Sequence, residues 1–373
     1  MRSMKSRLSR SAVPTPALVI DLDALERNIT AMATFVAKAG KRLRPHAKTH
    51  KCVAIARMQI AAGAVGISCA TLDELAAMVA GGVPGLLLTS PIAGEPKFEH
   101  LHELLQRDPG ITVVVDDPQA VAILDALANG LGLRIRVLVD FDVGQRRTGS
   151  PSVAAAVALA REIRSRGGLR FEGIQAYAGH IQHVRDLQER RIACEGVADQ
   201  VRTLCAALTS EQLTPRVVTG AGTGSMEFDG SGQVYTELQA GSYVFMDAEY
   251  LAVGGLKGRF EPALFVDTTV VGAQWEGHVT TDAGTKAFAL NGRAPSPARE
   301  ESGWVYSYTG DEFGCVTLGP GARRPAWGER LSFVVSHCDP TVVLYPHYVC
   351  VRGEAVEGYW SIETRLYPMI QGL

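Results

Sequence analysis

The stretch ITVVVDDPQAVAILDALANGLGLRIRVLVD, residues 111–140, decides the fold class. It opens with a β-branched run at 111–115, continues through the Ala- and Leu-rich segment PQAVAILDALANG, and closes with a second apolar run at 134–140. The glycine at the end of the middle segment is typical of a helix C-terminus. A strand, a helix and another strand in this order predict two parallel strands joined by a helical crossover.

The same alternation extends over the first two-thirds of the chain. Eight strands that alternate with helices predict a closed (β/α)8 barrel rather than an open Rossmann sheet. The helical signal is weakest between the last two strands. The predicted strands lie near residues 42–46, 65–69, 85–89, 111–115, 134–140, 171–177, 216–219 and 235–239.

From about residue 256 the sequence becomes β-branched and aromatic and is interrupted by Gly and Pro, with little helical period. This change predicts a second, mostly β domain. The early run ALVIDLD (17–23) could pair with either domain. We assign residues 23–255 to the barrel, and residues 256–373 together with the N-terminal strand 12–22 to the β-rich domain.

The composition excludes several classes of protein. The chain has 373 residues, 46% of them hydrophobic, and a net charge of −2, which gives no electrostatic reason to expect nucleic acid or an anionic membrane as a partner. No apolar run approaches the ~20 residues that span a bilayer. The seven cysteines are odd in number and lack C-x-x-C pairing, which favours a reducing cytoplasm over a disulfide framework.

Polar and glycine-rich segments follow the predicted strands, where the active residues of such barrels lie. TGAGTGS (219–225) follows the seventh strand and offers backbone N–H groups unshielded by Cβ atoms, plus the hydroxyls of Thr223 and Ser225. Ser242 and Tyr243 add donors after the eighth strand. Such a nest suits a phosphate dianion. The alternative is that these glycines only form turns.

Lys48 lies in HAKTHK (46–51), directly after the first predicted strand. Crowding by neighbouring cationic side chains predicts a depressed pKa for Lys48, which favours the neutral amine that a Schiff base requires. Taken alone, the segment is better interpreted as a solvated basic loop. An amine and a phosphate nest on the same rim are together what pyridoxal 5'-phosphate (PLP) requires.

A third motif, SHCDP (336–340), ends the β-rich run LSFVVSHCD. In a strand, His337 and Asp339 would point to one face and Cys338 to the other. An imidazole beside a carboxylate suits a hard divalent ion such as Mn²⁺ or Mg²⁺, whereas a thiolate at that face would favour Zn²⁺. A hydrogen-bonded His–Asp pair without metal is the alternative.

These motifs resemble the fold-type III PLP enzymes, specifically the D-threonine aldolase and D-serine dehydratase-like family, with the aldolase subgroup favoured. That family implies an alanine racemase-like fold, and the resemblance covers nearly the whole chain. RPHAKTHK and HCD in combination are quite specific, whereas the glycine motifs are not. The resemblance is carried by RPHAKTHK (44–51), DVGQRRTG (142–149), QAYAGHIQH (175–183), TGAGTG (219–224), QAGSYVFMD (239–247) and HCD (337–339).

The resemblance implies a role for each motif. Lys48 would hold the cofactor covalently, and His337 with Asp339 would hold the metal. His-Cys-Asp is the aldolase form of this motif, whereas dehydratases of the group typically have His-x-Cys. His183 would be the catalytic base, with His180 as the competing choice. The implied cofactor contacts besides Lys48 are Arg147, Tyr177, Gly222, Thr223, Gly241, Ser242 and Tyr243.

The implied activity is a lyase reaction that cleaves D-β-hydroxy amino acids of the D-threonine type to glycine and an aldehyde by retro-aldol. It would use PLP and a divalent metal, with Mn²⁺ favoured and Mg²⁺ or Zn²⁺ as alternatives. A metal-dependent D-serine or D-3-hydroxyaspartate dehydratase, which forms a 2-oxo acid and ammonia, is the second hypothesis, and a non-catalytic PLP carrier is the third. By analogy with the family we expect a homodimer that binds a small D-amino acid. From the composition we expect a cytoplasmic protein without nucleic acid or membrane as a partner.

Overall fold

Eight parallel strands form a barrel in the computed structural model, which describes residues 8–299 and 303–364. They follow one another in the order β2-β9-β8-β7-β6-β5-β4-β3. The two ends of this order meet through a parallel bridge between His46 and Ser68, and the Ser68 N–H donates to the Pro45 carbonyl. The predicted (β/α)8 fold is therefore confirmed. The strands are β2 (Arg42–Leu43), β3 (Ser68–Cys69), β4 (Leu87–Leu88), β5 (Thr112–Val115), β6 (Ile135–Asp140), β7 (Leu169–Ala176), β8 (Val217–Gly220) and β9 (Glu237–Leu238).

Helix α5 (Pro118–Leu131) shows why the sequence forms this fold. The Asp117 side chain accepts a hydrogen bond from the Gln119 N–H at the start of the helix, and Gly132 ends it with a φ of 65°. Its buried face is Ala120, Val121, Leu124 and Ala128, which repeats at helical spacing.

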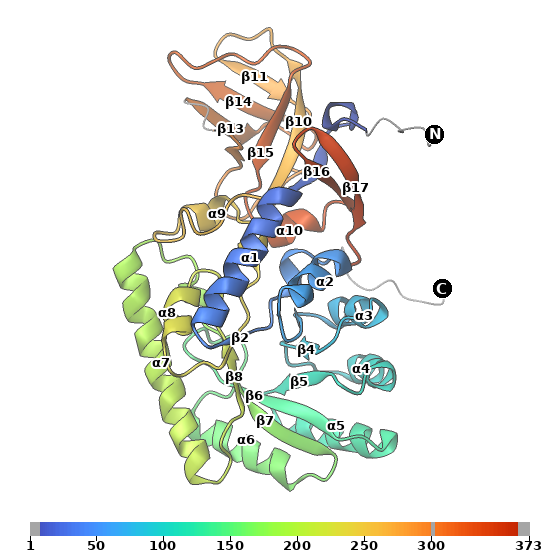
Figure 1. The fold of residues 1–373 in the computed structure, drawn as a ribbon, viewed down its shortest axis with the longest axis vertical. Helices are drawn as coiled ribbons and strands as arrows, with labels where there is room; N and C mark the ends of the chain where they lie inside the picture. The colour runs from blue at the N-terminus through green and yellow to red at the C-terminus, as the bar shows by residue number, and fades with distance from the viewer. Residues whose placement is uncertain (1–7, 300–302, 365–373) are drawn as a thin grey trace.

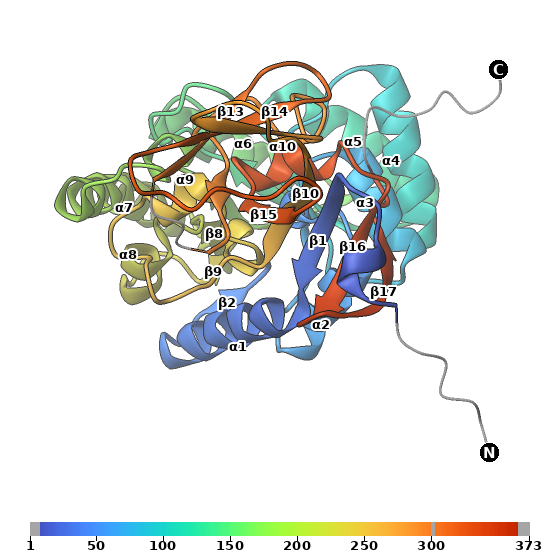
Figure 2. The same ribbon diagram turned by 90° about the horizontal axis from the view of Figure 1, so that it is seen from above.

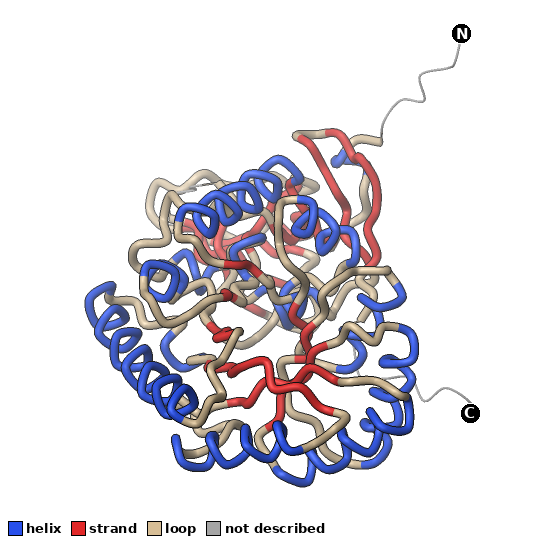
Figure 3. The backbone as a smooth tube through the Cα atoms, turned by 60° about the horizontal axis from the view of Figure 1, so that its bottom comes forward, coloured by secondary structure: helices blue, strands red, loops and turns tan. Residues whose placement is uncertain are grey.

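Helices surround the strands of the barrel (Figure 3). Within the described ranges, no helix is both long enough and apolar enough to cross a membrane. The helices besides α5 are α1 (Leu22–Lys38), α2 (Val53–Ala61), α3 (Leu72–Ala80), α4 (Glu95–Arg107), α6 (Val153–Ser165), α7 (Leu187–Ser210) and α8 (Met226–Ser231).

A nine-stranded sheet forms the second, mostly β domain (Figure 1). Strand β1 (Ala17–Asp21) lies inside this sheet, antiparallel to β10 (Leu264–Gly272) and parallel to β16 (His347–Arg352). Residues 300–302 and 365–373 of the predicted second domain lie outside the described residues. The other strands are β11 (His278–Thr281), β12 (Ser296–Pro297), β13 (Trp304–Tyr308), β14 (Gly314–Leu318), β15 (Arg330–Val334) and β17 (Ala355–Ser361).

The β-rich domain sits over the C-terminal ends of the barrel strands (Figures 1 and 2). At this junction the Tyr348 hydroxyl donates to the His50 carbonyl at 2.6 Å, and the Cys338 N–H donates to Asp247 Oδ2 at 2.9 Å. The second domain therefore covers the end of the barrel at which catalytic side chains are expected. The short helical segments are η1 (Arg10–Ala12), η2 (Ala47–Thr49), η3 (Gly179–Ile181), η4 (Ser242–Val244), α9 (Ala248–Leu251) and α10 (Cys338–Val342).

Candidate active site

Lys48 lies on η2, just beyond the C-terminal end of β2. The His46 ring precedes it and accepts from the Lys48 backbone N–H at 3.3 Å. The Lys48 side chain is half-buried and points to the β-rich domain, where its Nζ lies 3.0 Å from Asp339 Oδ2. The amine and the predicted metal ligand therefore share one space between the two domains.

The predicted depression of the Lys48 pKa is wrong. The Asp339 carboxylate raises the pKa of Lys48 above its ordinary value, and this effect exceeds the opposing effect of burial. Burial would raise the pKa of Asp339, but the ammonium of Lys48 and the ring of His337 hold it below its ordinary value. The sequence neighbours of Lys48 suggested repulsion, but the partner that decides its charge comes from the other domain.

The glycine-rich loop between β8 and α8 presents only part of its donors to the pocket. Gln182 Oε1 accepts from the Gly224 and Ser225 N–H groups at 3.1 and 3.2 Å. The hydroxyls of Ser225 and Thr223 accept from the N–H groups of Gly222 and Tyr243. Most of the donors predicted for the phosphate thus stabilise the loop itself.

Backbone N–H groups of this rim remain open. Among the described residues, the backbone N–H groups of Thr223 and Ser242 have no acceptor, and both residues line the pocket. A Cβ at Gly222 would lie 2.3 Å from Gln182 Oε1, and one at Gly241 would lie 2.9 Å from Thr49 Oγ1. Glycine is required at both positions because other elements approach so closely. The loop therefore fits a small anion held by main-chain donors.

One pocket at the barrel mouth contains most of the predicted cofactor contacts. Tyr243 is the exception, because its side chain is fully buried, packs on Phe260 and hydrogen-bonds Gln59 at 3.0 Å. The predicted residues that line the pocket are Lys48, Arg147, Tyr177, Gly222, Thr223, Gly241 and Ser242.

The sequence reasoning missed a polar network on the inner wall of this pocket. Gln239 Nε2 donates to Gln175 Oε1 at 3.1 Å, and Gln175 Nε2 donates to Asp140 Oδ1 at 2.9 Å. On the adjacent wall the His46 ring lies 3.1 Å from the Thr89 hydroxyl. Polar residues at the ends of otherwise apolar strands were the available signal.

The strand predicted through the HCD motif is wrong. Strand β15 ends at Val334, and helix α10 begins at Cys338, with His337 as its N-cap residue. Pro340 lies in the first turn of this helix, where the missing N–H costs nothing, whereas in a strand it would remove a ladder hydrogen bond. His337 and Asp339 therefore flank the start of a short helix instead of alternating along a strand.

The surroundings of this motif fit a divalent ion with two protein ligands. Asn291 lies 2.7 Å from His337 Nδ1, which leaves Nε2 available. Asp339 Oδ1 is buried and has no hydrogen-bond partner among the described residues. Within the same ranges no cluster of three or more His, Cys, Asp or Glu side chains could hold a metal. A bound ion would therefore keep open positions for water or substrate.

The two candidate bases lie in different surroundings. The His183 ring lies 4.6 Å from the Tyr250 ring and 6.4 Å from the His337 ring, measured between centroids. His180 is exposed, and its ring faces Gly144. The structure thus brings His183, and not His180, next to the predicted metal ligands.

Comparison with known proteins extends these observations to the whole chain. Residues 20–249 match the family "Alanine racemase, N-terminal domain", and residues 263–351 match a serine dehydratase domain family. The chain is 39% identical to a D-threonine aldolase from an Arthrobacter species over 95% of this chain and 93% of that protein. It is 34% identical to a 3-hydroxy-D-aspartate aldolase from Paracoccus denitrificans, with 96% and 94% covered. The crystal structure of D-threonine aldolase from Filomicrobium marinum is similar with a TM-score of 0.92 at 38% identity, covering 96% of this chain and 98% of that one.

Proposed function

Since the chain belongs to the fold-type III PLP-dependent family that includes D-threonine aldolase and D-serine dehydratase, we propose that it cleaves D-β-hydroxy amino acids of the D-threonine type to glycine and an aldehyde. It is a PLP-dependent lyase of the D-threonine aldolase kind. The proposal adds a divalent metal, with Mn²⁺ favoured over Mg²⁺ and Zn²⁺, because the candidate ligands are an imidazole and a carboxylate.

The observation that supports the proposal best is the 3.0 Å contact between Lys48 Nζ and Asp339 Oδ2. It joins the pocket with the open N–H groups of Thr223 and Ser242 to the His337–Asp339 pair across the domain junction. One space therefore contains an amine, main-chain donors for a phosphate and two candidate metal ligands. A substrate with an amino group and a β-hydroxyl requires this combination, because PLP binds the first and a metal ion the second.

Each group would contribute in its own way. Bound PLP would supply an electron sink for the pair of electrons released when the Cα–Cβ bond breaks. A divalent ion on His337 and Asp339 would lower the pKa of the substrate β-hydroxyl. Lys48 would hold the cofactor, the Thr223 and Ser242 N–H groups would bind its phosphate, and Arg147 and Tyr177 would orient its ring.

His183 would then remove the proton from the β-hydroxyl. Desolvation lowers the pKa of His183, so the imidazole is neutral at neutral pH and able to accept a proton at a ring nitrogen. The covering β-rich domain would limit the access of water to the carbanion formed at Cα.

The decisive experiment is a product assay with metal. Metal-stripped, PLP-loaded protein should leave D-threonine unchanged, and addition of Mn²⁺ should yield glycine and acetaldehyde in equal amounts, with no reaction of L-threonine. Release of a 2-oxo acid and ammonia would make the protein a dehydratase. Absorbance of bound PLP without turnover of any D-β-hydroxy amino acid, with or without metal, would make it a carrier.

Replacement of His183 by Gln should reduce kcat/KM for D-threonine by roughly 10²- to 10⁴-fold, the usual contribution of a positioned base. Because the pKa of His183 lies below its ordinary value, wild-type activity should be complete at neutral pH and fall only as the pH drops through that lowered pKa. A pH profile of kcat/KM for both proteins checks this, since the acidic limb should vanish in the variant.

His180→Gln is the matched control, because it makes the same change on an exposed ring three positions away. It should stay within about twofold of the wild type, as surface changes usually do. A loss of activity in the His180 variant with a normal His183 variant would transfer the role of base to His180.

We also infer a cytoplasmic location and a homodimer. All seven cysteines are free, and five of them are buried, which suits a reducing compartment. The dimer rests on analogy with the fold family, and light scattering of the purified protein would test it.

A further inference from the structure

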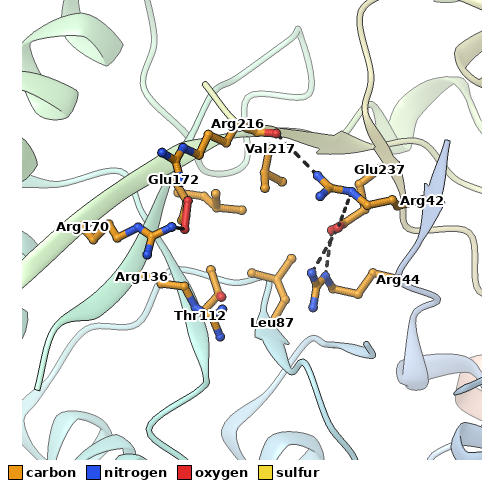
Figure 4. Close-up of a pocket in the computed structure, with 11 residues that line it drawn as sticks. Arg42, Arg44, Leu87, Thr112, Arg136, Arg170, Glu172, Arg216, Val217 and Glu237 are labelled. Atoms are coloured by element: carbon orange, nitrogen blue, oxygen red, sulfur yellow. Dashed lines mark hydrogen bonds and ion pairs between the residues drawn. The ribbon is translucent and has the colours of Figure 1, made fainter. Parts of the chain in front are cut away.

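A second charged pocket lies at the opposite end of the barrel from the candidate active site (Figure 4). It is formed at the N-terminal ends of the strands, has a volume of about 280 Å³, and shares no lining residue with the active-site pocket. Its charged lining residues are Arg42, Arg44, Arg136, Arg170, Arg216, Glu172 and Glu237.

The charges of this pocket do not balance. Glu237 is almost fully buried and accepts from Arg44 at 2.8 and 3.1 Å, and Glu172 is paired with Arg170. Five guanidinium groups against two carboxylates leave a net charge of +3. Because a guanidinium does not deprotonate in proteins, this excess persists at any physiological pH.

Three of the arginines lack a carboxylate at hydrogen-bond distance. Arg42 lies 3.8 Å from Glu237 and donates weakly to the Arg216 carbonyl at 3.5 Å, and Arg136 donates to the Gly110 carbonyl. The Arg216 guanidinium has no hydrogen bond or ion pair with any residue in 8–299 or 303–364. Figure 4 shows these side chains around a common open centre.

The scaffold of the pocket is rigid and its floor is apolar. Leu87 and Leu138 line the floor and belong to a buried cluster with Val114, against which Val217 packs. This layer fills the barrel interior. The arginines lie on β2, β6 and β7 or directly next to β2 and β8, and parallel pairing fixes the register of these strands. An ion-pair belt that only closes the barrel would explain the pairing of Arg42 and Arg44 with Glu237 and of Arg170 with Glu172. It would not explain Arg136 and Arg216, which have no carboxylate partner among the described residues.

We propose that this pocket binds a small phosphate-bearing anion. The planar donor fork of arginine matches the oxygens of phosphate, and a concave site of one charge sign concentrates ions of the other. A ligand with a charge of about −3, such as a diphosphate or a phosphate ester that also has a carboxylate, would balance the pocket. The apolar floor accommodates a short carbon skeleton. The proposal does not depend on the reaction at the other end of the barrel.

Calorimetric titration of the PLP-loaded protein with pyrophosphate, orthophosphate and tricarballylate tests the site. Bound PLP occupies the phosphate site of the 219–225 loop, so any binding of added phosphate that is measured takes place in the arginine-lined pocket. Pyrophosphate should bind saturably, more tightly than orthophosphate and than the tricarboxylate. Absence of saturable binding by either phosphate overturns the proposal, and tighter binding of tricarballylate overturns the assignment to phosphate.

Two substitutions with opposite expected signs locate the binding. Arg216→Gln replaces a guanidinium that has no partner among the described residues by a neutral amide. It should weaken pyrophosphate binding about tenfold, as expected for the loss of one charge-assisted hydrogen bond. Glu172→Gln keeps the side-chain volume but raises the net charge of the pocket, and should tighten binding.

Arg202→Gln on the exposed face of α7 is the control and should leave the affinity unchanged. Because Arg216 is exposed, its variant should fold normally, which a thermal melt verifies. Equal affinity of the Arg216 variant and the wild type, or equal weakening by the Arg202 variant, would refute the site.

Discussion

Replacing Lys48 with alanine will abolish the covalent attachment of PLP and reduce kcat/KM for D-threonine by roughly 10⁴-fold or more, as removal of a covalent catalyst does. Among the residues that line the pocket, Lys48 is the single lysine. No other primary amine of the pocket can replace it. Absorbance spectra of the purified protein after addition of PLP, together with a glycine assay, measure both effects.

Lys48→Arg separates the chemical role of the amine from its charge. The guanidinium can still pair with Asp339, so the variant should melt nearer to the wild type than Lys48→Ala does. It cannot attach PLP, and it should be as inactive as the alanine variant. If Lys48→Ala remained yellow and active, or if Lys48→Arg regained activity, the assignment of Lys48 would be wrong.

Replacing Asp339 with asparagine should weaken Mn²⁺ binding by roughly 10²-fold or more and reduce turnover in parallel. Mutation of a residue that only hydrogen-bonds a metal ligand typically lowers metal affinity by about 10- to 100-fold, and loss of a ligand itself should have a larger effect. The amide keeps the shape of the side chain but removes its charge. It also removes the partner that raises the pKa of Lys48, so this pKa should fall towards its ordinary value. Mn²⁺ titration followed by electron paramagnetic resonance measures the affinity independently of turnover.

Cys338→Ala is the matched control for Asp339, since it changes the adjacent residue of the same motif. Burial raises the pKa of the Cys338 thiol well above its ordinary value, so it stays protonated and is a poor metal ligand. Alanine retains the backbone N–H that donates to Asp247 Oδ2 and loses only the hydrogen bond of the thiol to the same carboxylate. The variant should therefore bind Mn²⁺ as the wild type does. Equal losses in the Cys338 and Asp339 variants would contradict the His337–Asp339 assignment.

The sequence predicted the barrel well because its signals are local. Each strand is a short apolar run, and each crossover has helical spacing with a cap, as in the stretch 111–140. All eight barrel strands fall within or next to the predicted runs. The first and last strands in the sheet order, β2 and β3, are shorter than the predicted runs and have only two residues each. Local pattern thus gives the element and its order, whereas pairing sets its length.

The errors arose where a partner distant in sequence decides the outcome. The pKa of Lys48 depends on Asp339, which comes from the other domain. The course of the chain at 337–342 depends on Pro340 and on Asp247, whose carboxylate accepts from the first N–H of α10. Tyr243 lies in a motif of the pocket rim, but its side chain packs into the core. Such contacts have no signature in a single sequence.

The position of β1 means that the β-rich domain is not a contiguous piece of the chain, because the whole barrel lies between its first strand and the others. Because β1 lies between β10 and β16, a deletion up to Asp21 would split the sheet. It would leave β10 and β16 each with one unpaired edge, although β10 would still pair with β15 and β16 with β17. No single cut of the polypeptide can therefore release an intact barrel and an intact β-rich domain as separate fragments. During synthesis β1 emerges long before its neighbours β10 and β16, so the sheet of the β-rich domain can form completely only after nearly the whole polypeptide has been made.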